Sequence, residues 1–156
     1  MKDRKIIEKE LKMKIYLDVC CFNRPFDDQS QIRIRLEAEA KLKIQEEIRS
    51  GNIQLVWSYI LDYENTRNPF QEKKEQIMVW RKYAKLDVQE NSETIRVAHA
   101  LRTKGFHKLD SLHLACAIST GCDFFLTTDD SILKKTELLN EVRIDDPIGF
   151  IKEVFS

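Results

Sequence analysis

Four acidic residues stand next to apolar segments, where their carboxylates could do chemistry rather than only face water. They are Asp18, Glu64, Asp110 and Asp129. In one shared pocket, four such groups would repel one another and raise their pKa values until protons or cations entered. Oxygen-only ligands select hard divalent cations such as Mg²⁺ or Mn²⁺ rather than zinc. A carboxylate-held metal pair activates water and stabilises a leaving oxygen, so these residue types suit phosphodiester hydrolysis without a His or Cys nucleophile.

Each of these acids also has an ordinary structural explanation. Asp110 and Asp129 could each cap a helix. Glu64 could lie on a solvated helix face, and Asp18 could bind a backbone turn. The chemical hypothesis therefore depends on whether the fold brings all four side chains to one place.

Short apolar runs predict the strands that would position the acids. Strands are expected at Ile15–Leu17, Ile53–Ser58, Asp123–Thr127 and Val142–Ile144. Val88 begins a further short extended piece. Strands that alternate with helices predict an α/β protein with a parallel sheet covered on both faces. Ligands bind outside the carboxyl ends of the strands in such sheets, which is where Asp18 and Asp129 are expected.

The helices are predicted between these strands. Their expected ranges are Gln31–Arg49, Tyr59–Arg67, Gln71–Lys85, Ser92–Lys104, Leu109–Thr120 and Pro147–Phe155, with a short helix opening at Asp129-Asp130. The first range is ambiguous, because alternate residues from Ile32 to Ile44 are apolar, as in a strand. An i+4 stripe from Ile32 to Ile48 also runs through it, and its length and Ala, Glu, Lys and Leu content favour a helix.

Length, charge and cysteine spacing limit the classes of protein to which this chain can belong. The chain has 156 residues, which predicts one domain, and 26 basic residues balance 26 acidic ones. Binding of nucleic acid by bulk positive charge is therefore excluded, and a polyanion must meet a local patch. No apolar run is long enough to span a bilayer and no signal peptide is recognisable, so we expect a cytoplasmic protein. The four cysteines lack C-x-x-C spacing and are expected to be buried thiols.

Four segments together resemble the PIN (PilT N-terminus) domain. They are Ile15-Tyr-Leu-Asp18, Ser58 to Glu64, Lys108-Leu-Asp-Ser-Leu-His-Leu-Ala-Cys-Ala117 and Phe125-Leu-Thr-Thr-Asp-Asp130. The resemblance covers Lys14 to about Phe155, and it implies a three-layer α/β/α sandwich and a metal-dependent ribonuclease that uses Mg²⁺ or Mn²⁺. Many bacterial and archaeal members are VapC-type toxins, so it also implies RNA as substrate, an antitoxin partner and a homodimer.

By position, the resemblance makes the four acids both the catalytic and the metal-binding residues. The candidate supporting residues are Asp130, Asn23 and Thr128. The family usually has a small hydroxyl residue and then Asn or Ser after the first Asp, whereas this chain has Val19 and Cys20. A hydrogen-bonding support is therefore either missing or supplied by Asn23. This departure leaves open a catalytically degenerate PIN module that binds RNA or a protein partner.

Met13-Lys-Ile-Tyr-Leu-Asp18 also looks like a PIN amino terminus in its own right. Residues 1–12 are therefore expected to be an extension, and residues 13–156 the nuclease domain.

A basic run leads into the third acid. The segment Arg96–Lys108 contains no acidic residue, which favours RNA contact over a merely solvated helix face. The candidate RNA-binding residues are Arg24, Arg67, Arg102, Lys104 and Lys108. His113 lies three residues after Asp110 and is expected to be a packed or hydrogen-bonded histidine rather than a ligand.

Overall fold

The computed structural model describes residues 12–23 and 30–155. Its centre is a sheet of five parallel strands in the order β3-β2-β1-β4-β5. The strands are β1 (Lys14–Leu17), β2 (Gln54–Ser58), β3 (Ala84–Val88), β4 (Phe124–Leu126) and β5 (Arg143–Asp145). The expected α/β fold with a parallel sheet is therefore confirmed. Of the expected extension, residues 1–11 lie outside the described residues, and Lys12 binds the Gly51 carbonyl through its ammonium group at 2.7 Å.

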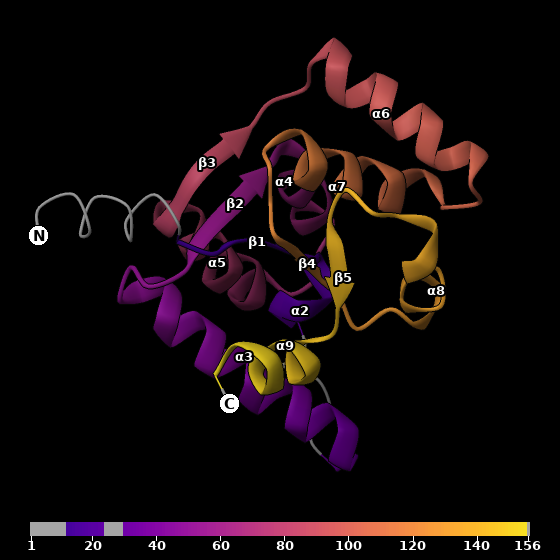
Figure 1. Ribbon diagram of the computed structural model, residues 1–156. Coiled ribbons are helices and arrows are strands. Elements are labelled where there is room, and N and C mark those ends of the chain that lie inside the picture. The colour runs from indigo at the N-terminus through magenta and orange to yellow at the C-terminus, as the bar shows by residue number, and fades with distance from the viewer. Residues whose placement is uncertain (1–11, 24–29, 156) are drawn as a thin grey trace, which may run out of the picture.

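Helices cover both faces of the sheet. The α-helices are α2 (Val19–Asn23), α3 (Ile32–Arg49), α4 (Tyr59–Thr66), α5 (Gln71–Val79), α6 (Ser92–Thr103), α7 (Lys108–Ser119), α8 (Asp130–Leu133) and α9 (Pro147–Val154). The 3₁₀ turns among the described residues are η2 (Trp80–Tyr83) and η3 (Thr136–Leu138). Figure 1 shows α3 packed with α9 on one side of the strands, and α6 packed with α7 on the other. This is the three-layer arrangement that the resemblance implied.

Strand pairing fixes the edge at which the acids gather. β1 lies between β2 and β4, with Ile15 opposite both Leu55 and Phe124. At the carboxyl end, Leu17 lies opposite Leu126, and the backbone N–H of Asp18 donates to the Leu126 carbonyl at 2.9 Å. The first residues after β1 and β4 therefore emerge side by side.

The ambiguous segment before β2 is a helix, as its length and composition indicated. Only part of the expected apolar stripe is buried, since Ile32 is 74% exposed while Ile44 and Ile48 lie in the core. Leu36 is also exposed, so the stripe is buried only in the later turns of α3. Within the described ranges, no helix is long and apolar enough to cross a membrane.

One predicted helix is wrong over its last part. The expected helix Gln71–Lys85 ends at Val79, passes through the 3₁₀ turn η2 and becomes β3 at Ala84. β3 pairs with β2 along Ala84–Val88, so Val88 ends an extended piece that it was expected to begin. Sheet pairing with β2 overrides the local preference for helix at this edge.

Candidate active site

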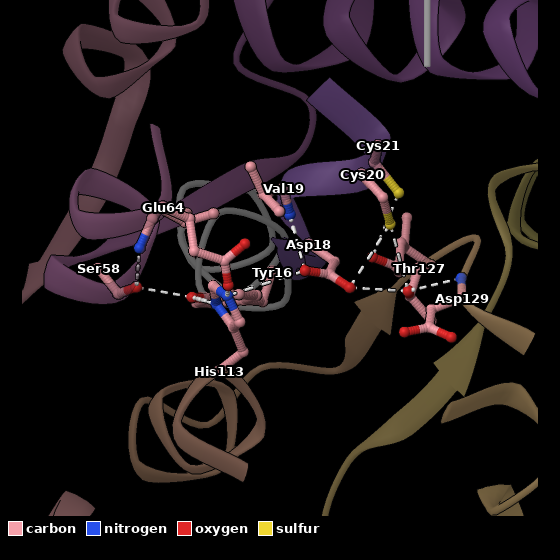
Figure 2. Close-up of polar contacts among 12 residues, drawn as sticks. Tyr16, Asp18, Val19, Cys20, Cys21, Ser58, Glu64, His113, Thr127 and Asp129 are labelled. Carbon is pink, nitrogen blue, oxygen red and sulfur yellow. Dashed lines mark hydrogen bonds and ion pairs between the residues drawn. The ribbon is translucent and has the colours of Figure 1, made fainter. Parts of the chain in front are cut away.

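Asp18 lies at the middle of the candidate site. It follows β1 directly and is only 6% exposed (Figure 2). Its Oδ2 accepts a hydrogen bond from the Thr127 hydroxyl at 2.8 Å, and its Oδ1 accepts one from the backbone N–H of Val19 at 2.8 Å. Hydrogen bonds to both oxygens therefore fix the orientation of this carboxylate.

The thiol of Cys20 lies beside the same carboxylate. Its Sγ is 3.5 Å from Oδ2 of Asp18 and 3.4 Å from the hydroxyl of Thr127, and it accepts the backbone N–H of Thr128 at 3.3 Å. Polar support is thus present where the sequence departs from the PIN pattern, and Cys20 and Thr127 supply it. The side chain of Asn23, the expected substitute, lies outside the described residues.

Thr127 and Thr128 divide the supporting role differently from the expectation. The side chain that binds Asp18 belongs to Thr127, whereas Thr128 contributes its backbone N–H to Cys20.

All four cysteines, which lie in the described ranges, are free, and Cys20 is the half-buried one. The expectation of buried thiols is therefore confirmed for Cys21, Cys116 and Cys122.

A buried histidine connects Glu64 to the interior. His113 on α7 is 2.6 Å through Nε2 from Oε1 of Glu64 on α4, and the same nitrogen is 3.8 Å from Oδ1 of Asp18. Behind it, Nδ1 of His113 is 2.5 Å from the Tyr16 hydroxyl, which is 2.6 Å from the Ser58 hydroxyl. Figure 2 shows these four side chains as a continuous row from Ser58 to Glu64. The expectation that His113 is a packed, hydrogen-bonded histidine is confirmed.

The charge state of His113 depends on the acids around it. Burial alone would lower the pKa of His113, but the hydrogen bond that its Nε2 donates to Glu64 and the charges of Asp18, Glu64 and Asp110 raise it overall. When neutral, the imidazole donates from Nε2 to Glu64 and accepts the Tyr16 hydroxyl proton at Nδ1. When protonated, it donates from both nitrogens and partly offsets the acidic charge.

Asp110 shares an electrostatic environment with Asp18 and Asp129. Its side chain is half-buried in the first turn of α7, and burial, together with the charges of Asp18 and Asp129, raises its pKa to about 6. Asp129 is exposed and caps α8, because its Oδ1 accepts the backbone N–H of Ser131 at 2.9 Å. The backbone N–H of Asp129 in turn donates to the Thr127 hydroxyl at 3.1 Å.

The four acids therefore converge on the carboxyl edge of the central strands, but they do not form a preformed coordination cage. Within the described part of the chain, no three His, Cys, Asp or Glu side chains are arranged to hold a metal ion. The donor chemistry nevertheless fits a hard divalent cation, since the groups are carboxylates. Burial, followed by the charges of Asp18 and Asp129, raises the pKa of Asp110 to about 6, and a bound cation would offset that concentration of negative charge. Asp18, Glu64, Asp110 and Asp129 are the residues that would hold it.

Asp130 lies on a different side of its helix. Its carboxylate accepts from the Arg33 guanidinium of α3 at 2.9 Å, and its side chain is 62% exposed. Of the two neighbouring acids, Asp129 is the one whose charge acts on Asp110.

The candidate RNA-binding residues fall into two groups. Arg67, the residue that follows α4, lines a cavity together with Glu64, and its guanidinium donates to the Tyr63 hydroxyl at 2.8 Å. Arg102 and Lys108 line a second cavity over α6 and α7, while Lys104 binds the Leu138 carbonyl at 3.3 Å. Arg24 lies outside the described residues.

Sequence reasoning missed Tyr16 and Ser58, whose hydroxyl groups extend the hydrogen-bonded row from His113 into the core. Tyr16 is read as a core residue of an apolar strand, and Ser58 as the polar end of the next strand. Ser58 has two roles, since it also caps α4 by accepting the backbone N–H of Leu61 at 3.2 Å. A tyrosine in an apolar run needs a partner for its hydroxyl, and this was the available signal.

Comparisons with known proteins bear on the fold. No family model matches the sequence, and no curated protein matches it. Chains of several solved structures are similar in three dimensions, and two of them come from VapBC complexes. A chain of VapBC2 from Rickettsia felis, bound to a DNA fragment from their promoter, superposes with a TM-score of 0.55 at 12% identity, covering 86% of this chain and 98% of that one. A chain of DNA-bound VapBC from Salmonella typhimurium gives 0.54 at 15% identity, with the same coverage.

These similarities agree with the observed topology. The chain has a five-stranded parallel sheet between helices, with acids at the carboxyl ends of its central strands. Its superposition on the two chains from VapBC complexes covers nearly the whole length of each of those chains. The resemblance drawn from the sequence is thereby confirmed for the architecture, and the chain has a PIN-like fold.

Proposed function

We propose that this protein is a metal-dependent endoribonuclease that hydrolyses RNA phosphodiester bonds at the carboxyl edge of β1. The observation that carries the proposal is the raised pKa of Asp110, whose second cause after burial is the charge of Asp18 and Asp129. Such a concentration of negative charge is typical of sites that bind cations. Mg²⁺ or Mn²⁺, when bound, would supply an activated water and neutralise the developing charge on the phosphate.

The protein's own residues have distinct roles in this proposal. Asp18 is the fixed reference point, because Thr127 and the Val19 backbone restrain both of its oxygens. His113 orients Glu64 through Nε2 and is itself held by Tyr16. Asp110 would release its proton as a cation arrives, since the cation stabilises the carboxylate form.

The structural neighbours suggest the biological setting. Both belong to VapBC complexes, so we propose that this chain is the toxin of a toxin–antitoxin pair and that a protein antitoxin binds it. A homodimer is part of the same proposal. RNA remains the proposed substrate, and the DNA in both neighbouring structures belongs to those proteins.

RNA cleavage in the presence of Mn²⁺ tests the activity. Wild-type protein, Asp18→Asn, Asp110→Asn and the double variant would be purified identically and given structured and unstructured RNA. We expect cleavage by the wild type and strong loss in both single variants. Equal cleavage by the purified double variant would assign the activity to a contaminant or to another site.

A second candidate function rests on the absence of a preformed cage among the described residues. In that case the chain is a non-catalytic PIN-like module that binds RNA or a protein partner. Calorimetric titration with Mn²⁺ distinguishes the two, because the nuclease should bind the ion and lose this binding in Asp18→Asn. A protein that binds RNA but neither binds Mn²⁺ nor cleaves would be the module.

A further inference from the structure

We propose that a cavity between α4 and α5 binds one nucleotide of single-stranded RNA beside the bond that is cleaved. This α4–α5 cavity has a volume of about 280 Å³, and its lining includes Val19, Glu64, Arg67, Asn68, Phe70 and Lys73. The inference rests on the proposed ribonuclease function and adds to it a specific subsite. Its three supports are continuity with the acids, paired positive charge and an exposed aromatic ring.

The cavity is continuous with the candidate active site. Glu64 belongs to both, since it contacts His113 inside the site and also lines the cavity. Val19 is likewise shared, because its backbone N–H binds Asp18 while the residue forms part of the cavity wall. A strand of RNA with its phosphate near Asp18 would therefore place the adjoining nucleotide against α4 and α5.

The charge in the cavity suits a phosphate. Arg67 and Lys73 both line it, against the single carboxylate of Glu64, which already has the hydrogen bond of His113. The Arg67 guanidinium is held in place by the Tyr63 hydroxyl at 2.8 Å through Nη1, and a guanidinium has five N–H donors in all. Restrained cations of this kind are well suited to phosphate oxygens.

Phe70 supplies an apolar surface within this polar wall. Its ring is 59% exposed, and its backbone is fixed where α5 begins, because its N–H donates to Oδ1 of Asn68 at 3.1 Å. The Lys73 ammonium lies 4.6 Å from the centre of the ring. An aromatic face next to cations is the combination that proteins use to stack bases of single-stranded nucleic acid while holding the backbone.

Binding without cleavage tests the subsite directly. The 156-residue chain in EDTA would be titrated into a fluorescently labelled 12-nucleotide oligouridine, and anisotropy would report the affinity. Phe70→Ala should weaken binding by about tenfold, the scale of one lost base stack. Phe70→Tyr should retain affinity, because the aromatic face remains.

The salt dependence of RNA binding tests the contribution of the Lys73 charge. Lys73→Gln should weaken binding and reduce the slope of log affinity against log salt by about 0.7, the value for one phosphate contact on a single strand. Matched controls are Tyr83→Ala, which removes another exposed ring, and Lys85→Gln, which removes an exposed cation on β3. Both controls should bind as the wild type does.

The possible outcomes separate this subsite from the proposed function. If the wild type binds and cleaves RNA but Phe70→Ala and Lys73→Gln match their controls, the subsite is overturned and the ribonuclease stands. If the wild type neither binds nor cleaves RNA, the proposed function fails and the subsite with it. Unchanged RNA binding in Phe70→Ala, combined with loss of a protein partner, would overturn the subsite and assign this face to protein contact. Circular dichroism would establish that each variant is folded.

Discussion

The four acids of the candidate site form two pairs that are held in different ways. Asp18 and Glu64, the inner pair, receive hydrogen bonds from Thr127 and His113, whose own positions are fixed by the core. Asp110 and Asp129, the outer pair, lie closer to solvent at the starts of two helices. Asp110 has its pKa raised to about 6, first by burial and then by the charges of Asp18 and Asp129.

This difference separates two requirements of a hydrolytic site. The inner pair is preorganised, because each carboxylate has a side-chain donor that restricts its orientation. The outer pair adds negative charge close to Asp18, and such a concentration of charge attracts a cation. We infer that the inner pair determines geometry and that the outer pair determines how strongly a cation is drawn in.

Removing the inner acid should have the largest effect. Asp18→Asn keeps the size of the side chain but removes its charge, so RNA cleavage with Mn²⁺ should fall about 100-fold or more, the scale seen when one electrostatic contribution to a transition state is lost. Initial rates on a fluorescent RNA would measure it. A rate within tenfold of the wild type would show that Asp18 is not at the reaction centre.

Removing the support of the inner pair should have a smaller effect on the same site. His113→Leu leaves Glu64 without its donor, so Mn²⁺ affinity should fall by about 10–100-fold, as for other residues that orient metal ligands. Tyr16→Phe removes only the hydroxyl behind His113 and should fall between the wild type and His113→Leu. Calorimetric titration measures both, and unchanged affinity in a folded His113→Leu protein would contradict the orienting role.

The outer pair should govern pH dependence of the metal-free protein. The pKa of Asp110 is about 6 in the fold and about 3.9 in an unfolded chain, so the folded state binds more protons between these values. Stability therefore falls as pH rises from about 4 to above 6, and the raised pKa of His113 contributes with the same sign. Asp110→Asn should flatten this decline in melting temperature between pH 4.5 and 7.5.

The same variant should also be more stable at the upper end of this range. The side chain is half exposed and partly screened, so we expect a gain of about 2–4 °C at pH 7.5, which corresponds to ~1 kcal/mol in a domain of this size. Glu137→Gln, at an exposed acid away from the site, is the control and should follow the wild type. A melting temperature of Asp110→Asn that is equal or lower would mean that these acids do not repel one another.

The smallest effect is expected just beside the outer pair. Asp130→Asn breaks an exposed ion pair with Arg33, which should cost less than about 1 kcal/mol. Cleavage should stay within about twofold of the wild type, because the Asp130 carboxylate is bound to the Arg33 guanidinium, whereas Asp129 is among the charges that raise the pKa of Asp110. A large loss of cleavage would mean that Asp130 acts in the site together with Asp110 and Asp129.

The sequence was enough to predict that Asp18 and Asp129 would each follow a strand of a parallel sheet. In parallel strands these two positions lie at the same edge of the sheet, and the structure shows that the two strands are also neighbours. The supporting residues were harder to predict. Thr127 and Thr128 have the same side chain, and only the register of β4 against β1 determines which hydroxyl faces Asp18.

The row from Ser58 to Glu64 could not be derived from local patterns. It joins β1, β2, α4 and α7, and its hydrogen bonds connect residues 42, 97 and 49 positions apart in the chain. The end of the expected helix Gln71–Lys85 was missed for a related reason. Pairing of Ala84–Val88 with β2 is a long-range interaction that helix propensity does not report.

The position of β1 has a consequence for how the protein opens. Its backbone is bonded to strands on both sides, and its three residues Ile15–Leu17 are fully buried. Amides in such a strand exchange with solvent through global unfolding rather than local fraying. Because Asp18 follows this strand directly, we expect the candidate site to unfold together with the whole domain and not in a separate local transition. Anything that binds at Asp18 should therefore slow deuterium uptake throughout the sheet.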